Sequence, residues 1–380
     1  MAFFVPILLV LILGGTNVYL AHRVWRWVHH FAPKLPFWVL LIFFLGMTAV
    51  MFLSVARPFD GWLQRAVSAV GTCWMGAFVY LTLCFLAADA VTLLGWLLRL
   101  VGLVPQDALE RLRLGAGMAA TALALSLCVY GVCHTQRLYT KEYQVTLSET
   151  PQSGMNVVFI SDVHLGAVGS EARLERIVER INALEPDLVC IGGDFFDNDF
   201  STIADPEKAL RTMKKLKAPY GVYACLGNHD AGKTFGAMED FFAQAGVKLL
   251  KEEYTLIDSR LILAGRLDPS PIGGAEGLRR GELSQVLDGA DLSLPVVVLD
   301  HNPISVDTYP GQVDLVLSGH THKGQIFPGE LVTDAMYTVD YGYYRAPSGT
   351  QAIVTSGAGT WGLPMRVGTN CEILWIQLNY

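Results

Sequence analysis

The chain has 380 residues, of which 52% are hydrophobic, and a formal net charge of −7. The charge is uneven: up to residue 150 there are 10 Lys and Arg against 6 Asp and Glu, a formal +4, and the remaining 18 against 29 give −11. The length allows two domains, and the change in composition places their boundary near residue 150. An acidic second half argues against a nucleic-acid partner, because a phosphate backbone is bound by clustered Lys and Arg.

Four apolar stretches in the first half are long enough to cross a bilayer, which takes about 20 helical residues. They are approximately Ala2 to Ala21, Pro36 to Ala56, Val67 to Ala88 and Leu114 to Val132. The first stretch lacks the basic start and cleavage pattern of a signal peptide, so it is expected to stay attached. We therefore expect an all-α, multi-pass anchor in the cell membrane over residues 1–139 and a linker over residues 140–154.

Basic residues in the short loops predict the orientation of this anchor. Six lie in the loops after the first and third spans, and four lie on the other side. This distribution predicts that the second half lies outside the cytoplasm. The apolar run of the third span continues past Asp89 to Val104, so it is either a long tilted helix or a span followed by an interfacial segment; a fifth crossing there would reverse the topology. Asp89 is interpreted as a helix end that faces the headgroups.

From Asn156 onward, short apolar runs alternate with amphipathic segments, which is typical of strands linked by helices. Helices are predicted over Ser170 to Leu184, Pro206 to Leu216 and Met238 to Ala245. Eight strands are predicted: Val157 to Ser161, Leu188 to Gly192, Gly221 to Leu226, Leu261 to Gly265, Val296 to Leu299, Leu315 to Ser318, Ala352 to Ser356 and Glu372 to Gln377. Residues 155–380 are thus expected to form an α/β domain that binds ligands beyond the carboxyl ends of its strands.

All five histidines of this half lie in polar strings that directly follow predicted strands. They are His164, His229, His301, His320 and His322, in the strings SDVHLG, LGNHD, LDHNP and SGHTHKG. Asp162 with His164, and His320 with His322, are two residues apart, so in an extended segment each pair projects from one face. Carboxylate, amide and imidazole groups suit divalent Mn, Fe or Zn, and the absence of thiolates argues against a closed structural zinc site. A turn or a buried histidine explains each string alone, but together they predict a metal centre.

In this order the strings resemble the D-x-H, G-D-x-x-D, G-N-H-D/E, H and G-H-x-H blocks of the calcineurin-like metallophosphoesterase superfamily, over about residues 156 to 380. The ending GHTHKGQ and the multispan N-terminal region resemble its bacterial membrane-associated branch, in which the position of Lys323 is often Gly. The resemblance implies a four-layer α/β fold, in which two mixed sheets pack face to face with helices outside.

The resemblance also implies roles for the matching residues. Asp162, His164 and His322 would hold one metal ion, Asn228, His301 and His320 would hold a second, and Asp194 would bridge the two. His229 would act as general acid with Asp230 as its orienting partner. Asp197 would contact the metal ligands without binding a metal ion itself.

No Ser or Cys lies in a nucleophile motif, so we expect a water shared by two cations to attack a phosphate ester or anhydride. The anchor favours a phosphodiesterase or pyrophosphatase acting on a lipid-linked or envelope substrate. Two alternatives stay open: an anchored phosphomonoesterase or phosphoprotein phosphatase, and a non-catalytic sensor of a phosphorylated ligand. Nothing in the sequence predicts an oligomeric state. Substrate contacts are expected from Lys323, Gln325, Arg266, Arg345 and Trp361.

Overall fold

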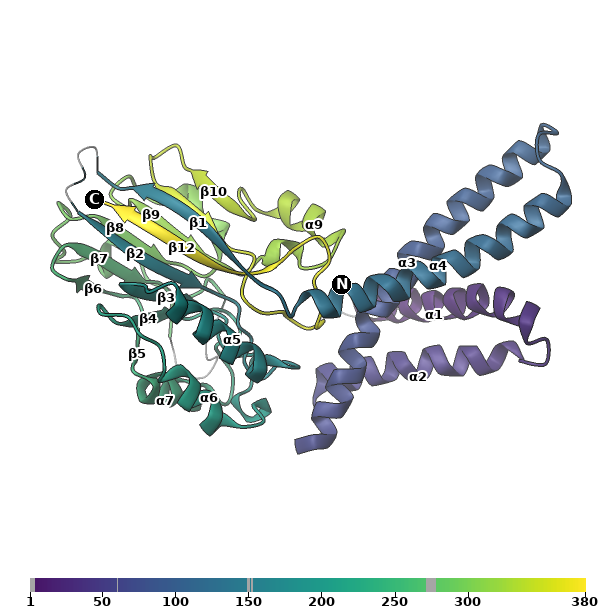
Figure 1. Ribbon diagram of the computed structural model, residues 1–380, viewed down its shortest axis with the longest axis horizontal. Coiled ribbons are helices and arrows are strands. Elements are labelled where there is room, and N and C mark those ends of the chain that lie inside the picture. Colours follow the sequence, from purple (N-terminus) through teal and green to yellow (C-terminus); the bar gives the residue numbers. More distant parts are fainter. Residues whose placement is uncertain (1–3, 60, 149–150, 152, 271–277) are drawn as a thin grey trace. The chain divides into compact units, whose positions relative to one another are not determined.

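A computed structural model of the chain describes residues 4–59, 61–148, 151, 153–270 and 278–380. The chain divides into two compact units, Met1–Val132 and Cys133–Tyr380. Within the described residues, the first unit is built from helices, and the second contains two six-stranded sheets flanked by helices (Figure 1).

The helical unit contains α1 (Phe4–Phe31), α2 (Phe37–Ala56), α3 (Gly61–Leu100) and α4 (Gln106–His134). Among the described residues, three helices are long and apolar enough to cross a membrane, namely α2, α3 and α4. The first predicted span, Ala2 to Ala21, begins outside the described residues and continues into α1. These helices identify the first unit as the membrane part of the chain.

Helix α3 runs through Asp89 without a break, so the helix end predicted at this residue is wrong. The helix has 40 residues and is about 60 Å long, roughly twice the hydrocarbon thickness of a bilayer. Asp89 forms an ion pair with Arg23 of α1 at 2.5 Å and accepts a hydrogen bond from the Tyr19 hydroxyl at 2.7 Å. These partners on a neighbouring helix explain why an acid is tolerated within an apolar helix.

The first sheet has the strand order β1-β12-β2-β3-β4-β5. Its strands are β1 (Leu138–Thr146), β12 (Cys371–Asn379), β2 (Gly154–Ile160), β3 (Leu188–Gly192), β4 (Val222–Cys225) and β5 (Val247–Leu249). Strand β12 is antiparallel to β2, and the other pairs are parallel. The linker expected over residues 140–154 is therefore wrong up to Thr146, because β1 pairs with β12 from Leu138↔Cys371 to Thr146↔Asn379.

The second sheet has the strand order β10-β11-β9-β8-β7-β6. Its strands are β10 (Gly342–Arg345), β11 (Gln351–Val354), β9 (Leu315–Ser318), β8 (Val296–Leu299), β7 (Leu261–Gly265) and β6 (Glu253–Ile257). The edge strands β10 and β6 are antiparallel to their neighbours, and the inner strands are parallel. All eight predicted strands are confirmed, and the three predicted helices correspond to α5 (Ser170–Ala183), α6 (Pro206–Met213) and α7 (Phe235–Ala245).

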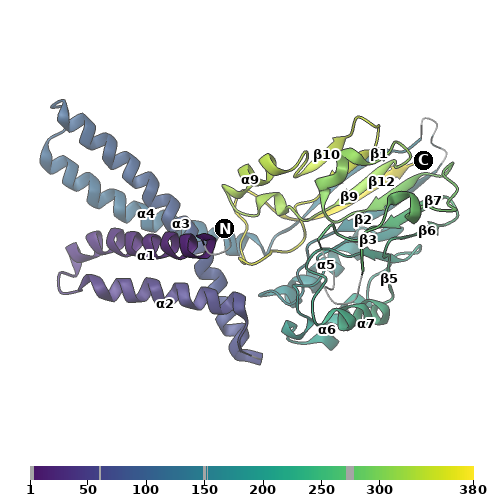
Figure 2. The same ribbon diagram turned by 180° about the vertical axis from the view of Figure 1, so that it is seen from behind.

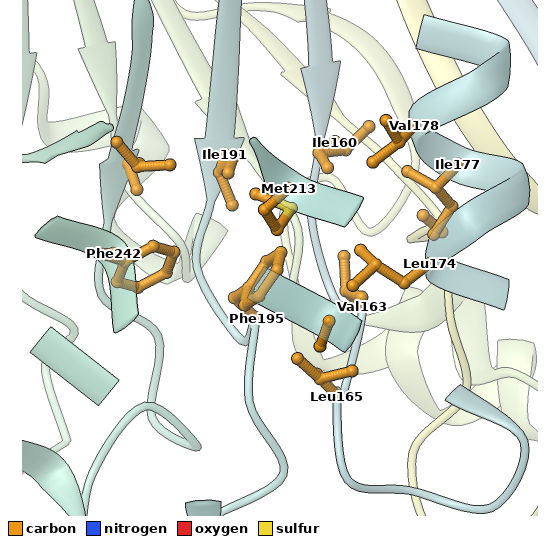
Figure 3. Close-up of a cluster of buried hydrophobic side chains, with 14 of the residues drawn as sticks. Ile160, Val163, Leu165, Leu174, Ile177, Val178, Ile191, Phe195, Met213 and Phe242 are labelled. Atoms are coloured by element: carbon orange, nitrogen blue, oxygen red, sulfur yellow. The ribbon is translucent and has the colours of Figure 1, made fainter. Parts of the chain in front are cut away.

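Alternate side chains of each strand enter different cores. Phe159 and Cys190 of the first sheet share a buried cluster with Leu263 of the second, so the two sheets pack face to face. Ile160 and Ile191 point to the other side of the first sheet, which α5, α6 and α7 cover (Figures 2 and 3). The short helices α8 (Leu283–Val286) and η2 (Pro303–Thr308) cover the outer face of the second sheet. The predicted four-layer sandwich is therefore confirmed.

Candidate metal centre

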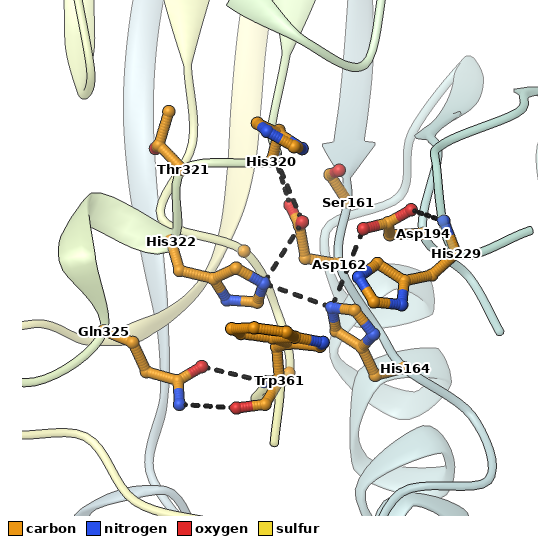
Figure 4. Close-up of polar contacts among 12 residues, drawn as sticks. Ser161, Asp162, His164, Asp194, His229, His320, Thr321, His322, Gln325 and Trp361 are labelled. Atoms are coloured by element: carbon orange, nitrogen blue, oxygen red, sulfur yellow. Dashed lines mark hydrogen bonds and ion pairs between the residues drawn. The ribbon is translucent and has the colours of Figure 1, made fainter. Parts of the chain in front are cut away.

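The seven residues predicted to bind metal follow the carboxyl ends of five strands. Figure 4 shows five of them converging: Asp162, His164, Asp194, His320 and His322. Asp162 and His164 follow β2, Asp194 follows β3, Asn228 follows β4, His301 follows β8, and His320 and His322 follow β9. Five of these residues have positive φ angles between 49° and 70°: Asp162, His164, Asp194, His320 and His322. This left-handed backbone costs on the order of 1–3 kcal/mol for each non-glycine residue, and such residues cluster at functional sites.

Two glycines let the ligand-bearing turns approach one another. A Cβ added at Gly193, where φ is 84°, would lie 2.8 Å from His301 Nδ1. A Cβ added at Gly227 would overlap the Asp194 carboxylate. The turns after β3, β4 and β8 can therefore meet at this distance because these two positions have no side chain.

The first group of ligands is formed by Asp162, His164 and His322, which are all buried. His322 Nε2 lies 3.3 Å from Asp162 Oδ1 and 3.1 Å from His164 Nε2. One ligand atom from each residue lies within 4.8 Å of the others, which is close enough for one small cation to reach all three.

The second group is formed by Asp194, His301 and His320, with Asn228 beside them. His301 Nε2 lies 3.1 Å from Asp194 Oδ2, and His320 Nδ1 lies 2.9 Å from Asn228 Oδ1. The same Asp194 oxygen is 3.9 Å from His164 Nε2 of the first group. The Asp194 carboxylate thus lies between the two groups, where a bridging ligand would be needed.

Hydrogen bonding around His301 leaves two acceptors facing each other. His301 Nδ1 lies 2.8 Å from the carbonyl oxygen of Gly192, so this nitrogen carries a proton and donates it. In the neutral ring, Nε2 then presents a lone pair to Asp194 Oδ2, and Nε2 is buried without a hydrogen-bond partner. Two such acceptors repel each other unless they share a cation. The residues therefore fit a divalent metal ion.

Carboxylates dominate the electrostatics of this centre. Burial lowers the pKa of His301, but Asp194 and two further carboxylates raise this pKa more, to well above its usual range. Burial raises the pKa of Asp194, but His301 and the neighbouring imidazoles bring this pKa below its usual range. Without a metal ion the carboxylates thus favour protons on the imidazoles, and a bound cation would replace those protons.

His229 lies beside both ligand groups. Its ring is 5.1 Å from the ring of His164, and its backbone N–H donates to Asp194 Oδ1 at 2.8 Å. The side-chain amide of Asn198 lies 2.5 Å from His229 Nδ1 and donates to it. Nε2 is then the nitrogen that carries the proton. Burial lowers the pKa of His229, and the Asp194 carboxylate opposes this effect.

Asp230 does not contact the His229 side chain, so its expected role as an orienting partner is wrong. Its two oxygens accept hydrogen bonds from the backbone N–H groups of Phe196 at 2.8 Å and Gly227 at 3.0 Å. Burial, followed by the charge of Asp194, raises the pKa of Asp230 to about 7. Asp230 therefore ties the turn after β4 to the turn after β3, and the orienting contact comes from Asn198.

Asp197 lies close to a metal-ligand candidate, as the sequence predicts. Its Oδ1 is 3.6 Å from His164 Nδ1, and it also lies within ligand distance of His229. A carboxylate in this position can orient a metal-binding imidazole and increase its basicity.

Arg366 is a component of the site that the sequence analysis missed. Its side chain is fully buried, and it donates hydrogen bonds to the carbonyl oxygens of Ser356 at 2.6 Å, Gly359 at 2.7 Å and His322 at 2.9 Å. Its Nη2 also lies 3.1 Å from His322 Nδ1. Burial and then the Arg366 charge hold the pKa of His322 well below its usual range. Arg366 therefore fixes the ring of His322 and keeps it uncharged, as a metal ligand must be.

Gln325 supports a loop and does not face a substrate, contrary to the prediction. Its Nε2 donates to the carbonyl oxygens of Trp361 at 2.8 Å and Leu363 at 3.0 Å, and its Oε1 accepts from the Trp361 N–H at 2.8 Å. The Trp361 indole is 53% exposed, and its ring lies 5.7 Å from that of His229 (Figure 4). Trp361 is thus the side chain that can meet a substrate, and Gln325 positions it.

Two of the three basic residues predicted to contact substrate, Lys323 and Arg266, differ in position. Lys323 follows His322 directly, and its Nζ lies 4.6 Å above the ring of Tyr341. Its φ of 50° is one that favours glycine, which accounts for the glycine common at this position in the resembling branch. Arg266 is buried and bound to Glu252 at 3.3 Å and to the Gly281 carbonyl oxygen at 2.5 Å, so the prediction that it contacts substrate is wrong.

Asp268 lies in the loop after β7 and caps it through one of its two carboxylate oxygens. Its Oδ1 accepts from the backbone N–H of Ser270 at 2.7 Å. Its Oδ2 is buried and has no hydrogen-bond partner among the described residues, and its charge raises the pKa of His301. Asp268 therefore adds to the negative potential around the second ligand group.

Known proteins are similar in sequence to this chain. A family model for the calcineurin-like phosphoesterases matches residues 155–324. A Danio rerio protein named transmembrane protein with metallophosphoesterase domain is 30% identical over 277 residues, covering 68% of this chain and 62% of its own length. An uncharacterized metallophosphoesterase of Campylobacter jejuni is 27% identical and covers 98% of this chain and 97% of its own length. Another from Bacillus subtilis is 31% identical and covers 62% of this chain and 83% of its own length.

The chain spans about three fifths of the length of several curated relatives that it matches. The family match ends just after the turn that follows β9 and carries His320 and His322, so it covers all seven proposed ligand positions. The sequence, the sandwich of two sheets and the convergent ligands agree, and the chain therefore belongs to the calcineurin-like phosphoesterases, a family of metal-dependent phosphoester hydrolases.

Proposed function

We propose that the chain is a membrane-anchored hydrolase of phosphate esters that binds two divalent metal ions. Mn, Fe or Zn suit the imidazole, carboxylate and amide ligands. In this proposal the first ion is held by Asp162, His164 and His322, the second by Asn228, His301 and His320, and Asp194 bridges both. The observation that carries the proposal is the buried pair of acceptors, His301 Nε2 and Asp194 Oδ2, at 3.1 Å.

Two divalent cations would supply the activation of a water and the neutralisation of phosphoryl charge. The protein supplies the positions of the reacting groups. Asp194 is fixed at both oxygens, because Oδ1 accepts the His229 N–H and Oδ2 faces His301. Arg366 fixes the ring of His322 in the same way. A site fixed by such contacts needs little reorganisation during the reaction.

We assign delivery of a proton to the leaving group to His229. Asn198 occupies Nδ1, so Nε2 is the nitrogen that can hold and release a proton. Burial lowers the pKa of His229. The negative charge of a bound phosphate ester would raise this pKa again and favour the protonated ring.

For the substrate, we favour a phosphodiester or pyrophosphate that is lipid-linked or part of the cell envelope. Helix α9 (Gly329–Met336) packs against the turn His322–Gly324, and none of its residues is buried. Leu331, Val332 and Met336 are each more than half exposed, and their spacing puts them on one side of the helix. An exposed apolar face beside the metal ligands, together with Trp361, supports a substrate that carries a hydrocarbon chain.

We also propose four membrane crossings, with the hydrolase domain outside the cytoplasm. The uneven distribution of loop charges supports this orientation, and α1 has 28 residues, enough to cross together with the three apolar helices. The test is a fusion after Tyr380 to a reporter protein that fluoresces only in the cytoplasm. If the hydrolase domain lies outside the cytoplasm, this fusion should not fluoresce. Fluorescence of that fusion would show the reverse orientation.

Two other functions are compatible with the same ligands. A phosphomonoesterase or phosphoprotein phosphatase would use the same centre with a different substrate surface. A sensor would bind a phosphorylated ligand without turnover. The presence of His229 beside a full ligand set supports an enzyme, because a binding protein needs no general acid.

Activity of the detergent-purified chain tests these functions. The panel contains a phosphate monoester, a phosphopeptide, a water-soluble diester, and lipid-linked diesters and pyrophosphates, each assayed with added Mn²⁺ and with a chelator. We expect metal-dependent turnover with the highest kcat/KM on a lipid-linked diester or pyrophosphate. Preference for the monoester or phosphopeptide would favour the first alternative, and metal-dependent binding without turnover would favour the sensor.

A further inference from the structure

The helical unit contains a second cluster of charged side chains, which we call the arginine pocket. A cavity of about 460 Å³ lies between α1 and α4. It is lined by Arg23, Arg26 and His30 from α1 and by Arg111 and Arg113 from α4. Four guanidinium groups therefore face one cavity.

The acidic residues around the pocket neutralise part of this charge but not all of it. Asp107 and Glu110 line the same cavity; Asp107 pairs with Arg111 at 2.7 Å, Arg23 pairs with Asp89 at 2.5 Å, and Glu110 accepts a hydrogen bond from Gln106 at 3.1 Å. Four arginines against these three carboxylates leave one positive charge in excess. Within the described ranges, Arg26 and Arg113 form no hydrogen bond and no ion pair. Like charges confined to one cavity repel each other unless an anion joins them.

Arg23 adds a buried donor without an acceptor. Its side chain is 10% exposed, and one of its terminal nitrogens pairs with Asp89. Its Nε is buried and has no hydrogen-bond partner in the described parts of the chain. A buried N–H without an acceptor is destabilising, so a ligand that accepts a hydrogen bond from this N–H would be stabilising.

Part of the lining of the pocket is apolar. Trp27 and Leu114 line it, and Trp27 packs on α4 where Gly117 leaves room: a Cβ added there would lie 3.3 Å from the indole. The Trp27 Nε1 donates to Thr121 Oγ1 at 3.1 Å, which fixes the ring. A ligand with a charged group and a hydrocarbon part would match both the arginines and this wall.

The position of the pocket along α4 indicates an interface between membrane and water. From Leu114 to the last residue of α4, His134, the helix rises about 30 Å, which is the hydrocarbon thickness of a bilayer. If α4 crosses the membrane, the pocket lies at the headgroup level of the leaflet at the amino-terminal end of this helix. This is also the side on which the loop charges are concentrated.

We propose that the arginine pocket binds the phosphate group of an anionic phospholipid in that leaflet. Guanidinium groups donate paired hydrogen bonds to phosphate oxygens, and Arg23, Arg26 and Arg113 have donors available for this purpose. A free phosphate offers the same oxygens without the hydrocarbon part. The inference does not depend on the catalytic activity of the second unit.

The test uses the full chain purified in a neutral detergent. Native mass spectrometry counts retained lipid after equilibration with phosphatidylglycerol, with phosphatidylcholine, or with inorganic phosphate in place of lipid. The double variant Arg26→Gln/Arg113→Gln is compared with Arg99→Gln, which removes an exposed positive charge from the last turn of α3 but leaves the pocket intact. Arg26→Lys and Arg113→Lys keep the charge and remove the planar guanidinium.

We expect one phosphatidylglycerol retained by the wild type and by Arg99→Gln, with binding at least about tenfold weaker in the double Gln variant and intermediate in the Lys variants. Inorganic phosphate that competes with the lipid at millimolar concentration would support the shared phosphate chemistry. Equal retention of both lipids, or the same loss in Arg99→Gln as in the double variant, would overturn the proposal. If the double variant does not fold, unchanged lipid binding in both Lys variants would overturn it as well.

Discussion

The metal centre and the arginine pocket each bring groups of one polarity together, and this polarity is opposite in the two sites. In the metal centre, His301 Nε2 and Asp194 Oδ2 are 3.1 Å apart, and both are acceptors when the imidazole is neutral. In the arginine pocket, donors face one cavity, and Arg23 Nε has no acceptor in the part of the chain that the structure describes. The sign of the unmatched groups indicates the sign of the ligand, a cation in the first case and an anion in the second.

The two clusters also differ in rigidity. His322 is fixed by Arg366, Asp194 by the His229 N–H, and His301 by the Gly192 carbonyl oxygen, so each of these groups has a supporting contact. Arg26 and Arg113 have none among the described residues. A preorganised site can select a metal geometry and support catalysis, whereas a loosely held set of cations can accept different headgroups.

The largest effect is expected from a substitution of Asp194 in the metal centre. Asp194→Asn keeps the size of the side chain but removes the charge that faces both ligand groups. We expect kcat/KM to fall by on the order of a thousandfold, because both cations lose a ligand at once. The assay is steady-state turnover at saturating Mn²⁺, with the exposed Asp240→Asn as the control. A loss below about tenfold would show that Asp194 does not bridge the groups.

The general acid gives the next largest effect and separates proton transfer from metal binding. His229→Ala should keep its metal ions and lose on the order of a hundredfold in rate on esters with poor alkoxide leaving groups. A nitrophenyl ester, whose leaving group needs little protonation, should be affected much less. Asn198→Ala should show a weaker form of the same selective loss. Metal loss in His229→Ala, or equal rate losses on both esters when chemistry is limiting, would count against this role.

Arg366 tests whether rigidity matters in the metal centre. Arg366→Met should weaken metal binding by roughly 10- to 100-fold, because the His322 ring loses its support. Activity should then recover at high metal concentration, and Arg366→Lys should lie between the variant and the wild type. Competition with a fluorescent chelator measures the affinity. If metal affinity stays at the wild-type value in Arg366→Met, the positioning role is wrong.

The smallest effect is expected at the substrate side of the centre. Trp361→Ala should raise KM for a lipid-linked substrate by about fivefold, because a half-exposed indole contributes about 1 kcal/mol of contact. The value of kcat should stay within about twofold, since the metal ligands are untouched. Gln325→Ala should raise KM in the same way, because the loop that carries Trp361 loses its hydrogen bonds to Gln325. A change in kcat without a change in KM would place Trp361 in the chemistry instead.

The fold could be predicted where strands are buried on both faces. Val157 to Ser161 and Val296 to Leu299 read as continuous apolar runs, and both are strands. Strand β1 was missed because it lies at a sheet edge, and its polar residues, such as Lys141 and Glu142, read as a linker. A long helix through Asp89 was one of two alternatives, and the sequence could not decide between them because the partner that stabilises this acid, Arg23, is distant in sequence.

The site could be predicted where its residues follow strands in short strings. Asp162 and His164 are one example, and the structure brings them together with His322. Arg366 and Asn198 could not be found this way, because each acts on a residue far along the chain: Arg366 lies 44 residues after His322, and Asn198 lies 31 before His229. Asp230 was assigned wrongly because adjacency in sequence to His229 does not bring the two side chains together.

The number of metal ions per chain tests the central claim most directly. Elemental analysis of the purified full chain should give close to two divalent ions, and still two in His229→Ala. Asp194→Asn should lower the occupancy of both sites together, because the same carboxylate lies between them. One ion per chain in the wild type, unchanged by Asp194→Asn, would contradict the two-metal centre.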